Sequence, residues 1–280
     1  MQRGGNGAVY KARFCRKVCA AALLRRRGRC ACHDERAWSG GNNLSVAAGV
    51  SLLREGAGKD LVFLHGYLSC KESFYHQINC LKKFYRVTAF DFWGMGKSEP
   101  LSQAWSVGDY AEHTSELLKK LGIRDAYLIA HSFGGRVALK LLSKPDPPFQ
   151  RALLTGCAGL LPRRGIRYAL RVKSYRVMRK IAPKFAERKF GSDEYRTLSP
   201  VMRESFKKIV NEDLAPCAQK IRIPVLYVFG EKDTATPPYM AERLHRLTRG
   251  SGLVYMEGCT HFCFCENPAK FNAIAREFFR

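Results

Sequence analysis

The stretch LIAHSFGG, residues 128–135, carries the strongest structural signal in the chain. Its apolar first half is typical of a buried β-strand, and the small residues after Ser132 suit the start of a helix. A serine at such a sharp strand-to-helix turn projects its hydroxyl above the sheet, and small neighbours relieve the crowding. The stretch therefore predicts Ser132 as a nucleophile. It also predicts that the backbone N–H of Phe133, at a helix N-terminus, faces the reacting oxygen.

Similar short runs rich in apolar, β-favouring residues recur on both sides of this stretch. They cover residues 60–65, 86–91, 126–131, 150–155, 223–229 and 252–256. Helical patterns separate them, including one over 107–121 that ends at Gly122 and a last one from about residue 269 to the C-terminus. Continuous apolar strands suit a sheet covered on both faces. The pattern predicts an α/β fold with a doubly wound, mostly parallel sheet.

Further polar residues follow the predicted strands. Tyr67 lies after a strand and a glycine turn, where its N–H would be a second oxyanion donor opposite that of Phe133. We expect His65 and Asp91 to brace their own turns by hydrogen bonds. Asp233 and His261 also follow strand-like runs, and a carboxylate just beyond a strand end can reach a histidine.

These residues suggest one mechanism. A serine hydroxyl is a weak nucleophile unless a base removes its proton during attack. His261 would act as that base, and Asp233 would fix the imidazole tautomer and stabilise its transient charge. The chain order Ser, Asp, His differs from that of other triad folds.

Over residues 44–280 the chain resembles the α/β-hydrolase superfamily, specifically its capped, esterase-like branch with H-G, D-x-x-G-x-G-x-S and G-H-S-x-G-G blocks. The resemblance implies Ser132, Asp233 and His261 as catalytic residues and the N–H groups of Tyr67 and Phe133 as the oxyanion hole. It also implies a helical cap over 157–217. The chain departs from the pattern at Ala130 and Thr260, where glycine is common.

The distribution of charge along the chain indicates the domain boundaries. Net charge is +24, and the excess is concentrated in residues 1–40 and 157–210. We predict a basic, disordered arm over 1–42, a core over 43–156 and 218–280, and an inserted cap over 157–217. Within the cap, apolar residues recur at helical spacing: Ile166, Leu170, Val177, Met178 and Ile181.

The leading functional prediction is a carboxylic ester hydrolase that acts on a small-molecule acyl substrate through an acyl-enzyme. A C–C bond hydrolase of a ring-fission diketone would use the same triad, and a binding protein of this fold without turnover is a third reading. The mechanism requires no cofactor. We expect no specific nucleic-acid partner, no transmembrane segment and a cytoplasmic location, while oligomeric state stays open.

The 11 cysteines are too few for a disulfide scaffold and fit small buried residues in a reducing compartment. Cys259, Cys263 and Cys265 surround His261, but a metal there would remove the base, so we predict no metal site. Oxidation of these thiols, with loss of activity, is a separate hypothesis.

Overall fold

The computed structural model describes residues 49–162 and 198–280, which form two compact units. The larger unit draws on residues up to 100, 107–160 and 213–280, and the smaller on 101–106 and 161–212. The predicted arm over 1–42 and the apolar series from Ile166 to Ile181 lie outside the described residues.

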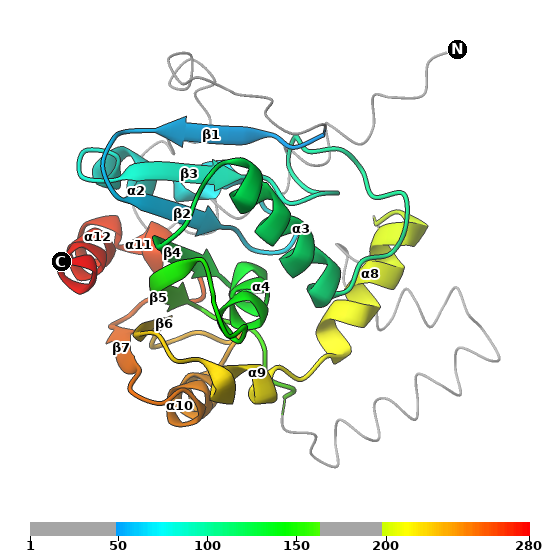
Figure 1. Cartoon of the computed structure of the whole chain (residues 1–280). Helices are drawn as coiled ribbons and strands as arrows, with labels where there is room; N and C mark the ends of the chain where they lie inside the picture. The colour runs from blue at the N-terminus through cyan, green and yellow to red at the C-terminus, as the bar shows by residue number, and fades with distance from the viewer. Residues whose placement is uncertain (1–48, 163–197) are drawn as a thin grey trace. The chain divides into compact units, whose positions relative to one another are not determined.

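The larger unit is built on a seven-stranded sheet with the order β1-β3-β2-β4-β5-β6-β7 (Figure 1). Its strands are β1 (Leu52–Glu55), β2 (Asp60–Leu64), β3 (Arg86–Phe90), β4 (Ala126–His131), β5 (Phe149–Thr155), β6 (Val225–Gly230) and β7 (Gly252–Met256). All neighbouring pairs are parallel except β1 with β3. The predicted mostly parallel sheet is therefore confirmed. The antiparallel edge strand β1 was not predicted.

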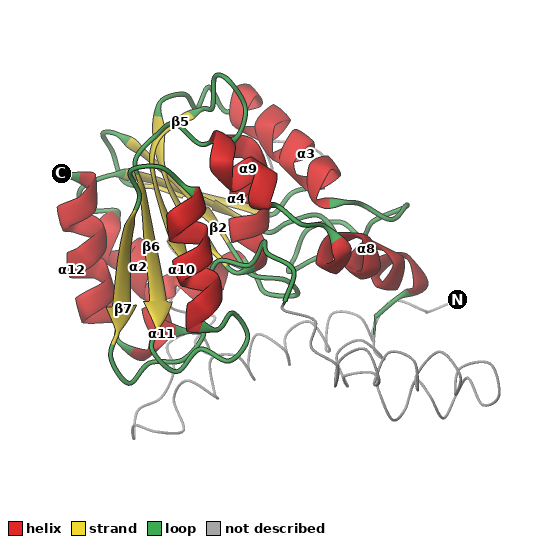
Figure 2. Ribbon diagram, turned by 90° about the horizontal axis from the view of Figure 1, so that it is seen from below, coloured by secondary structure: helices red, strands yellow, loops and turns green. Residues whose placement is uncertain are grey.

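Helices connect the strands and cover the sheet. In the larger unit they are η3 (Lys71–Phe74), α2 (Tyr75–Leu81), α3 (Val107–Lys120), α4 (Phe133–Leu142), α9 (Ala215–Lys220), α10 (Pro238–Leu247), α11 (Cys263–Glu266) and α12 (Pro268–Phe279). In Figure 2, α12 and α10 lie on opposite sides of β6 and β7. Gly122 has a φ of 66° and its N–H bonds to Lys119 C=O at 3.0 Å, which ends α3 where the glycine predicted.

The core explains why the strands read as apolar runs. Every residue of β2 is buried, and Phe63, Val87 and Ile129 from three strands pack with Ile78 of α2 and Phe271 of α12 in one cluster. A strand covered on both faces cannot alternate apolar with polar residues.

The smaller unit contains α8 (Pro200–Asn211), whose side-chain contacts run to the segment 101–106. Ser205 Oγ donates to Trp105 C=O at 2.6 Å and accepts from Trp105 N–H at 3.1 Å. Ser199 caps the helix, and Pro200 fits its first turn because that position needs no N–H partner.

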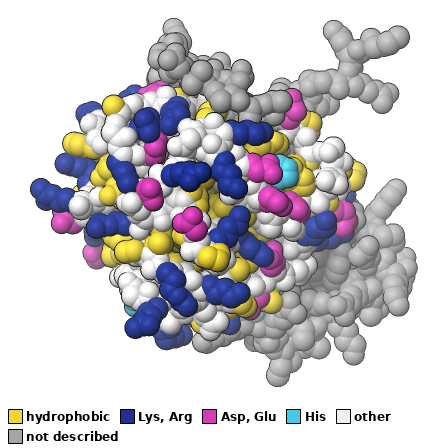
Figure 3. Space-filling view, in the orientation of Figure 1, with side chains coloured by type: hydrophobic (Ala, Val, Ile, Leu, Met, Phe, Trp, Pro, Cys, Tyr) yellow, Lys and Arg dark blue, Asp and Glu magenta, His cyan; other side chains and the backbone are white. Residues whose placement is uncertain are grey.

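Charged side chains are mixed over the face shown in Figure 3, where Lys and Arg side chains of the described residues lie among Asp and Glu side chains. Most of the two basic segments, 1–40 and 157–210, lies outside the described residues. Each described helix is too short or too polar to cross a bilayer.

Candidate active site

The polar residues singled out in the sequence gather at one end of the sheet. Strands β2 to β7 run parallel, so the carboxyl ends of these strands lie together at that end. Ser132 follows β4, Asp233 follows β6 and His261 follows β7.

Ser132 occupies a strained turn. Its φ of 51° is rare for a residue with a side chain, and it directly precedes α4. The glycines after it are needed for space. A Cβ on Gly134 would lie 2.2 Å from Leu64 C=O, and one on Gly135 would lie 2.6 Å from Cys157 Sγ. Ala130 is fully buried within β4, so the methyl group at this departure from the motif is accommodated.

The two predicted oxyanion residues are neighbours. Leu64 of β2 pairs with Ala130 of β4, which brings the segments that follow these strands together. The Tyr67 and Phe133 rings contact edge to face with centroids 5.5 Å apart. Phe133 begins α4, so its N–H belongs to the first turn of a helix.

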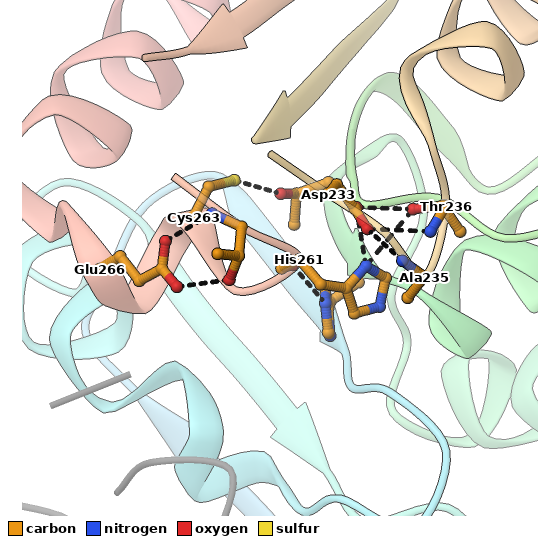
Figure 4. Close-up of polar contacts among 9 residues, drawn as sticks. Asp233, Ala235, Thr236, His261, Cys263 and Glu266 are labelled. Carbon is orange, nitrogen blue, oxygen red and sulfur yellow. Dashed lines mark hydrogen bonds and ion pairs between the residues drawn. The ribbon is translucent and has the colours of Figure 1, made fainter. Parts of the chain in front are cut away.

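Asp233 and His261 form a direct pair, shown in Figure 4. Asp233 Oδ2 accepts a 2.8 Å hydrogen bond from His261 Nδ1 and a 2.7 Å bond from the Thr236 hydroxyl. Asp233 Oδ1 accepts from the N–H groups of Ala235 and Thr236 at 2.8 and 2.9 Å. These bonds hold the carboxylate in one orientation.

The environment keeps Asp233 ionised. Burial by itself raises the pKa of this carboxyl, but the bonds and charge from His261 and the bonds from Thr236 outweigh it, so the pKa is lowered. A carboxylate bound to Nδ1 fixes the tautomer in which Nε2 is free of a proton and can act as a base.

His131 also lies at this site, although no role was predicted for it. Its side chain is buried, and its Nε2–H donates to His261 C=O at 3.1 Å. The two imidazole centroids are 4.8 Å apart, so the residue immediately before Ser132 touches His261. Burial lowers the pKa of His131 well below its ordinary range, which keeps the ring neutral. In the sequence, His131 is marked only by the histidine of the G-H-S-x-G-G block that the resemblance supplied.

The bracing roles predicted for His65 and Asp91 are confirmed by their hydrogen bonds. His65 Nδ1 bonds to Gly66 C=O at 2.7 Å, and its Nε2 accepts from Phe92 N–H at 3.0 Å. Asp91 accepts from the N–H groups of Lys71 and Lys97 at 2.7 and 2.8 Å.

Lys71 was not anticipated. Its side chain is only 3% exposed, and its ammonium contacts Asp91 Oδ2 at 3.2 Å, Glu72 Oε1 at 3.1 Å and Ser51 Oγ at 2.7 Å. The burial of this lysine cannot be found from sequence spacing, since Ser51 and Asp91 come from the ends of separate strands.

The described cysteines are free thiols. Burial raises the pKa of Cys263 to about 12, and burial also raises the pKa of Cys259. Thiolate is the form that oxidants attack, so burial makes Cys259 and Cys263 less reactive than exposed thiols, and the hypothesis of an oxidation-sensitive site stays a prediction. Within residues 49–162 and 198–280, no group of three or more His, Cys, Asp and Glu side chains is arranged to hold a metal ion.

The chain is similar to known proteins over most of its length. Residues 61–274 match the family model described as "Alpha/beta hydrolase family". A pimeloyl-[acyl-carrier protein] methyl ester esterase of Neisseria meningitidis is 28% identical over 243 residues, covering 79% of this chain and 76% of that protein.

Two solved structures share the fold. An esterase from Exiguobacterium antarcticum has a TM-score of 0.66 at 23% identity, covering 82% of this chain and 94% of that one. A meta-cleavage product hydrolase from Pseudomonas fluorescens IP01 has a TM-score of 0.64 at 20% identity, covering 82% and 93%.

Proposed function

The chain belongs to the alpha/beta hydrolase family, and we propose that within it the protein is a serine hydrolase that cleaves small carboxylic esters. The observation that carries the proposal is the 2.8 Å bond between Asp233 and His261, at the sheet edge where Ser132 occupies its strained turn. A histidine oriented by a buried carboxylate, at the same end of the sheet as a serine on a strand-to-helix turn, is suited to acyl transfer.

The first half of the proposed reaction forms an acyl-enzyme. Ser132 Oγ attacks the ester carbonyl carbon while its proton passes to His261 Nε2. The N–H groups of Phe133 and Tyr67 stabilise the negative charge on the former carbonyl oxygen, and Asp233 stabilises the imidazolium. The C–O bond then breaks, and the leaving alcohol takes the proton from His261.

The second half restores the enzyme with water. His261 removes a proton from a water molecule as its oxygen attacks the acyl carbon, and the same proton then returns to Ser132 Oγ when the acid leaves. This scheme uses only residues of the chain and water, so we propose no cofactor and no metal.

An ester is favoured over the other bonds that this chemistry can break. The Neisseria relative is named as a methyl ester esterase and aligns over 79% of this chain. Cleavage of a C–C bond in a ring-fission diketone is the alternative, because a meta-cleavage product hydrolase shares the fold. Measuring the hydrolysis of an ester and of a ring-fission diketone by the same preparation distinguishes the two activities.

The test is hydrolysis of p-nitrophenyl butyrate by the protein and by Ser132→Ala, with Ser143→Ala as the matched control at the far end of α4. We expect Ser132→Ala to lose at least about a thousandfold in kcat and Ser143→Ala to keep the activity. A fluorophosphonate probe should label the protein and leave Ser132→Ala unlabelled. Absence of both turnover and labelling would contradict the proposal and favour a binding role.

We also propose that the protein works in a reducing compartment, the cytoplasm. The described cysteines are all free, including buried Cys157 and Cys263, which suits reducing conditions. Fractionation of cells that express the full chain tests this, and recovery in an oxidising compartment would contradict it.

A further inference from the structure

The loop that carries His261 has a threonine directly before the histidine. Thr260 has two hydrogen-bond donors, its N–H and its hydroxyl, and both bond to one carboxylate. Thr260 N–H donates to Glu266 Oε2 at 2.6 Å, and Thr260 Oγ donates to Glu266 Oε1 at 2.5 Å. Hydrogen bonds to an ionised acceptor are shorter and stronger than neutral ones. Glycine at position 260 would offer only the first of the two.

A second contact holds the backbone at the histidine itself. His131 Nε2–H donates to His261 C=O, so the N–H of the preceding residue and the carbonyl of His261 are each bonded to a side chain. Gly156 approaches the ring itself, since a Cβ there would lie 3.1 Å from His261 Nδ1. The orientation of the imidazole thus depends on how firmly the backbone is held.

Glu266 is well placed for this role. It is the last residue of α11, which is followed at once by α12, so the carboxylate is carried by a helical segment rather than by the histidine loop. Figure 4 shows the Glu266 carboxylate turned toward the segment that leads to His261. Glu266 therefore ties the histidine loop to the end of α11.

We propose that Glu266, acting through Thr260, is a positioning residue that sets the orientation of His261. The effect on turnover rests on the function proposed above, because it assumes that His261 is the base. Misplacement of a catalytic group by about 1 Å can cost on the order of 10²-fold in rate. Loss of the two Thr260–Glu266 hydrogen bonds should then lower kcat and leave substrate binding unchanged.

The kinetic test compares Glu266→Ala, Thr260→Val and Thr260→Ser in p-nitrophenyl butyrate hydrolysis. We expect Glu266→Ala to lower kcat about 10- to 100-fold with KM within about twofold. Thr260→Val keeps the N–H bond and should lose less. Thr260→Ser keeps both bonds and should restore the rate to within about twofold of the parent.

Glu231 provides a matched control. Its carboxylate also accepts from a backbone N–H of this loop, that of Gly258 at 2.9 Å, but at an exposed position farther from the histidine. Glu231→Ala should leave kcat and KM unchanged. An equal loss of kcat in Glu231→Ala would mean that any loosening of the loop slows turnover, and it would overturn the proposal.

A spectroscopic measurement keeps the proposal independent of turnover. The His261 Nδ1–H proton bonded to Asp233 should give a downfield proton resonance, assigned by its loss in His261→Gln. We expect this resonance to shift or broaden in Glu266→Ala and to stay in place in Thr260→Ser and Glu231→Ala. An unshifted resonance together with an unchanged kcat in Glu266→Ala would overturn the proposal. A shifted resonance in a protein without esterase activity would support the positioning role while the ester function fails.

Discussion

Asp233 and Asp91 are two buried carboxylates at the carboxyl ends of strands in one sheet, and they differ in the side chain that each faces. Asp91, after β3, is fully buried and contacts the ammonium of Lys71 at 3.2 Å. Asp233, after β6, is 3% exposed and contacts His261 at 2.8 Å. Both are held by backbone N–H groups, two of them in each case.

The difference separates a carboxylate in a structural ion pair from a carboxylate in the proposed catalytic pair. A lysine ammonium keeps its proton near neutral pH, so the pair Asp91–Lys71 has one state and joins the start of η3 to the end of β3. An imidazole nitrogen that carries no proton can accept one from a nucleophile during a reaction, so the pair Asp233–His261 suits the proposed role of His261 as a base. Each aspartate directly follows an apolar strand run, so the strand pattern does not distinguish them, but the chain order Ser, Asp, His does, because only Asp233 lies between Ser132 and His261.

The largest effect should come from Asp233→Asn. The amide keeps the shape but favours the wrong imidazole tautomer, and we expect kcat to fall about 10⁴-fold while the midpoint of thermal unfolding changes little. Ester hydrolysis and calorimetry on the same preparations measure both. The matched change Asp91→Asn should leave far more turnover per folded molecule, and equal losses in the two variants would remove the distinction between them.

The second effect is on stability. Asp91→Asn removes the charge facing a buried lysine and replaces an acceptor with a donor, so we expect the free energy of unfolding to fall by about 3 kcal/mol or more. Denaturant titration with and without Lys71→Met in the same chain measures the coupling. If Asp91→Asn proves as stable as the parent, the buried ion pair is not what holds this turn.

The smallest effect is on the pH dependence of stability. The pKa of Asp233 is lower in the folded protein than in the unfolded chain. This group therefore adds stability that is fully present above the ordinary carboxyl pKa of about 4 and is lost as pH falls through the lower folded value. Denaturant titrations at about pH 6 and about pH 3 should show a larger loss of unfolding free energy in the parent than in Asp233→Asn. Equal losses in the two proteins would show that the carboxylate is not stabilised in the fold.

Much of the core architecture was accessible from the sequence. The apolar runs that end at His65 and His131 correspond to β2 and β4, because strands covered on both faces must be continuously apolar. The edge strand β1 was missed, since a strand of four residues has little periodicity of its own and is defined by its pairing with β3. The helix α11 was also missed, because it has only four residues and so shows little periodicity.

The candidate site was predicted only in part. Ser132, Asp233 and His261 stood out because each ends an apolar run in a motif with a mechanism. Thr236, His131 and Glu266 did not, because their roles are hydrogen bonds to the backbone or side chains of those residues or of Thr260. Such bonds depend on where a loop turns, and a linear pattern does not record that.

The sequence by itself determined the order of strands and helices, the parallel sheet and the positions of the serine, aspartate and histidine along the chain. Local propensity and the spacing of apolar residues are enough for that, because each strand must bury both faces. The pairing of Asp233 with His261 was already predicted, and only the tertiary structure showed that Asp91 meets a buried lysine. It also showed that Glu266 and His131 hold the backbone around His261. These pairings join residues from different strand ends, so they exist only once the parallel sheet has brought those ends together.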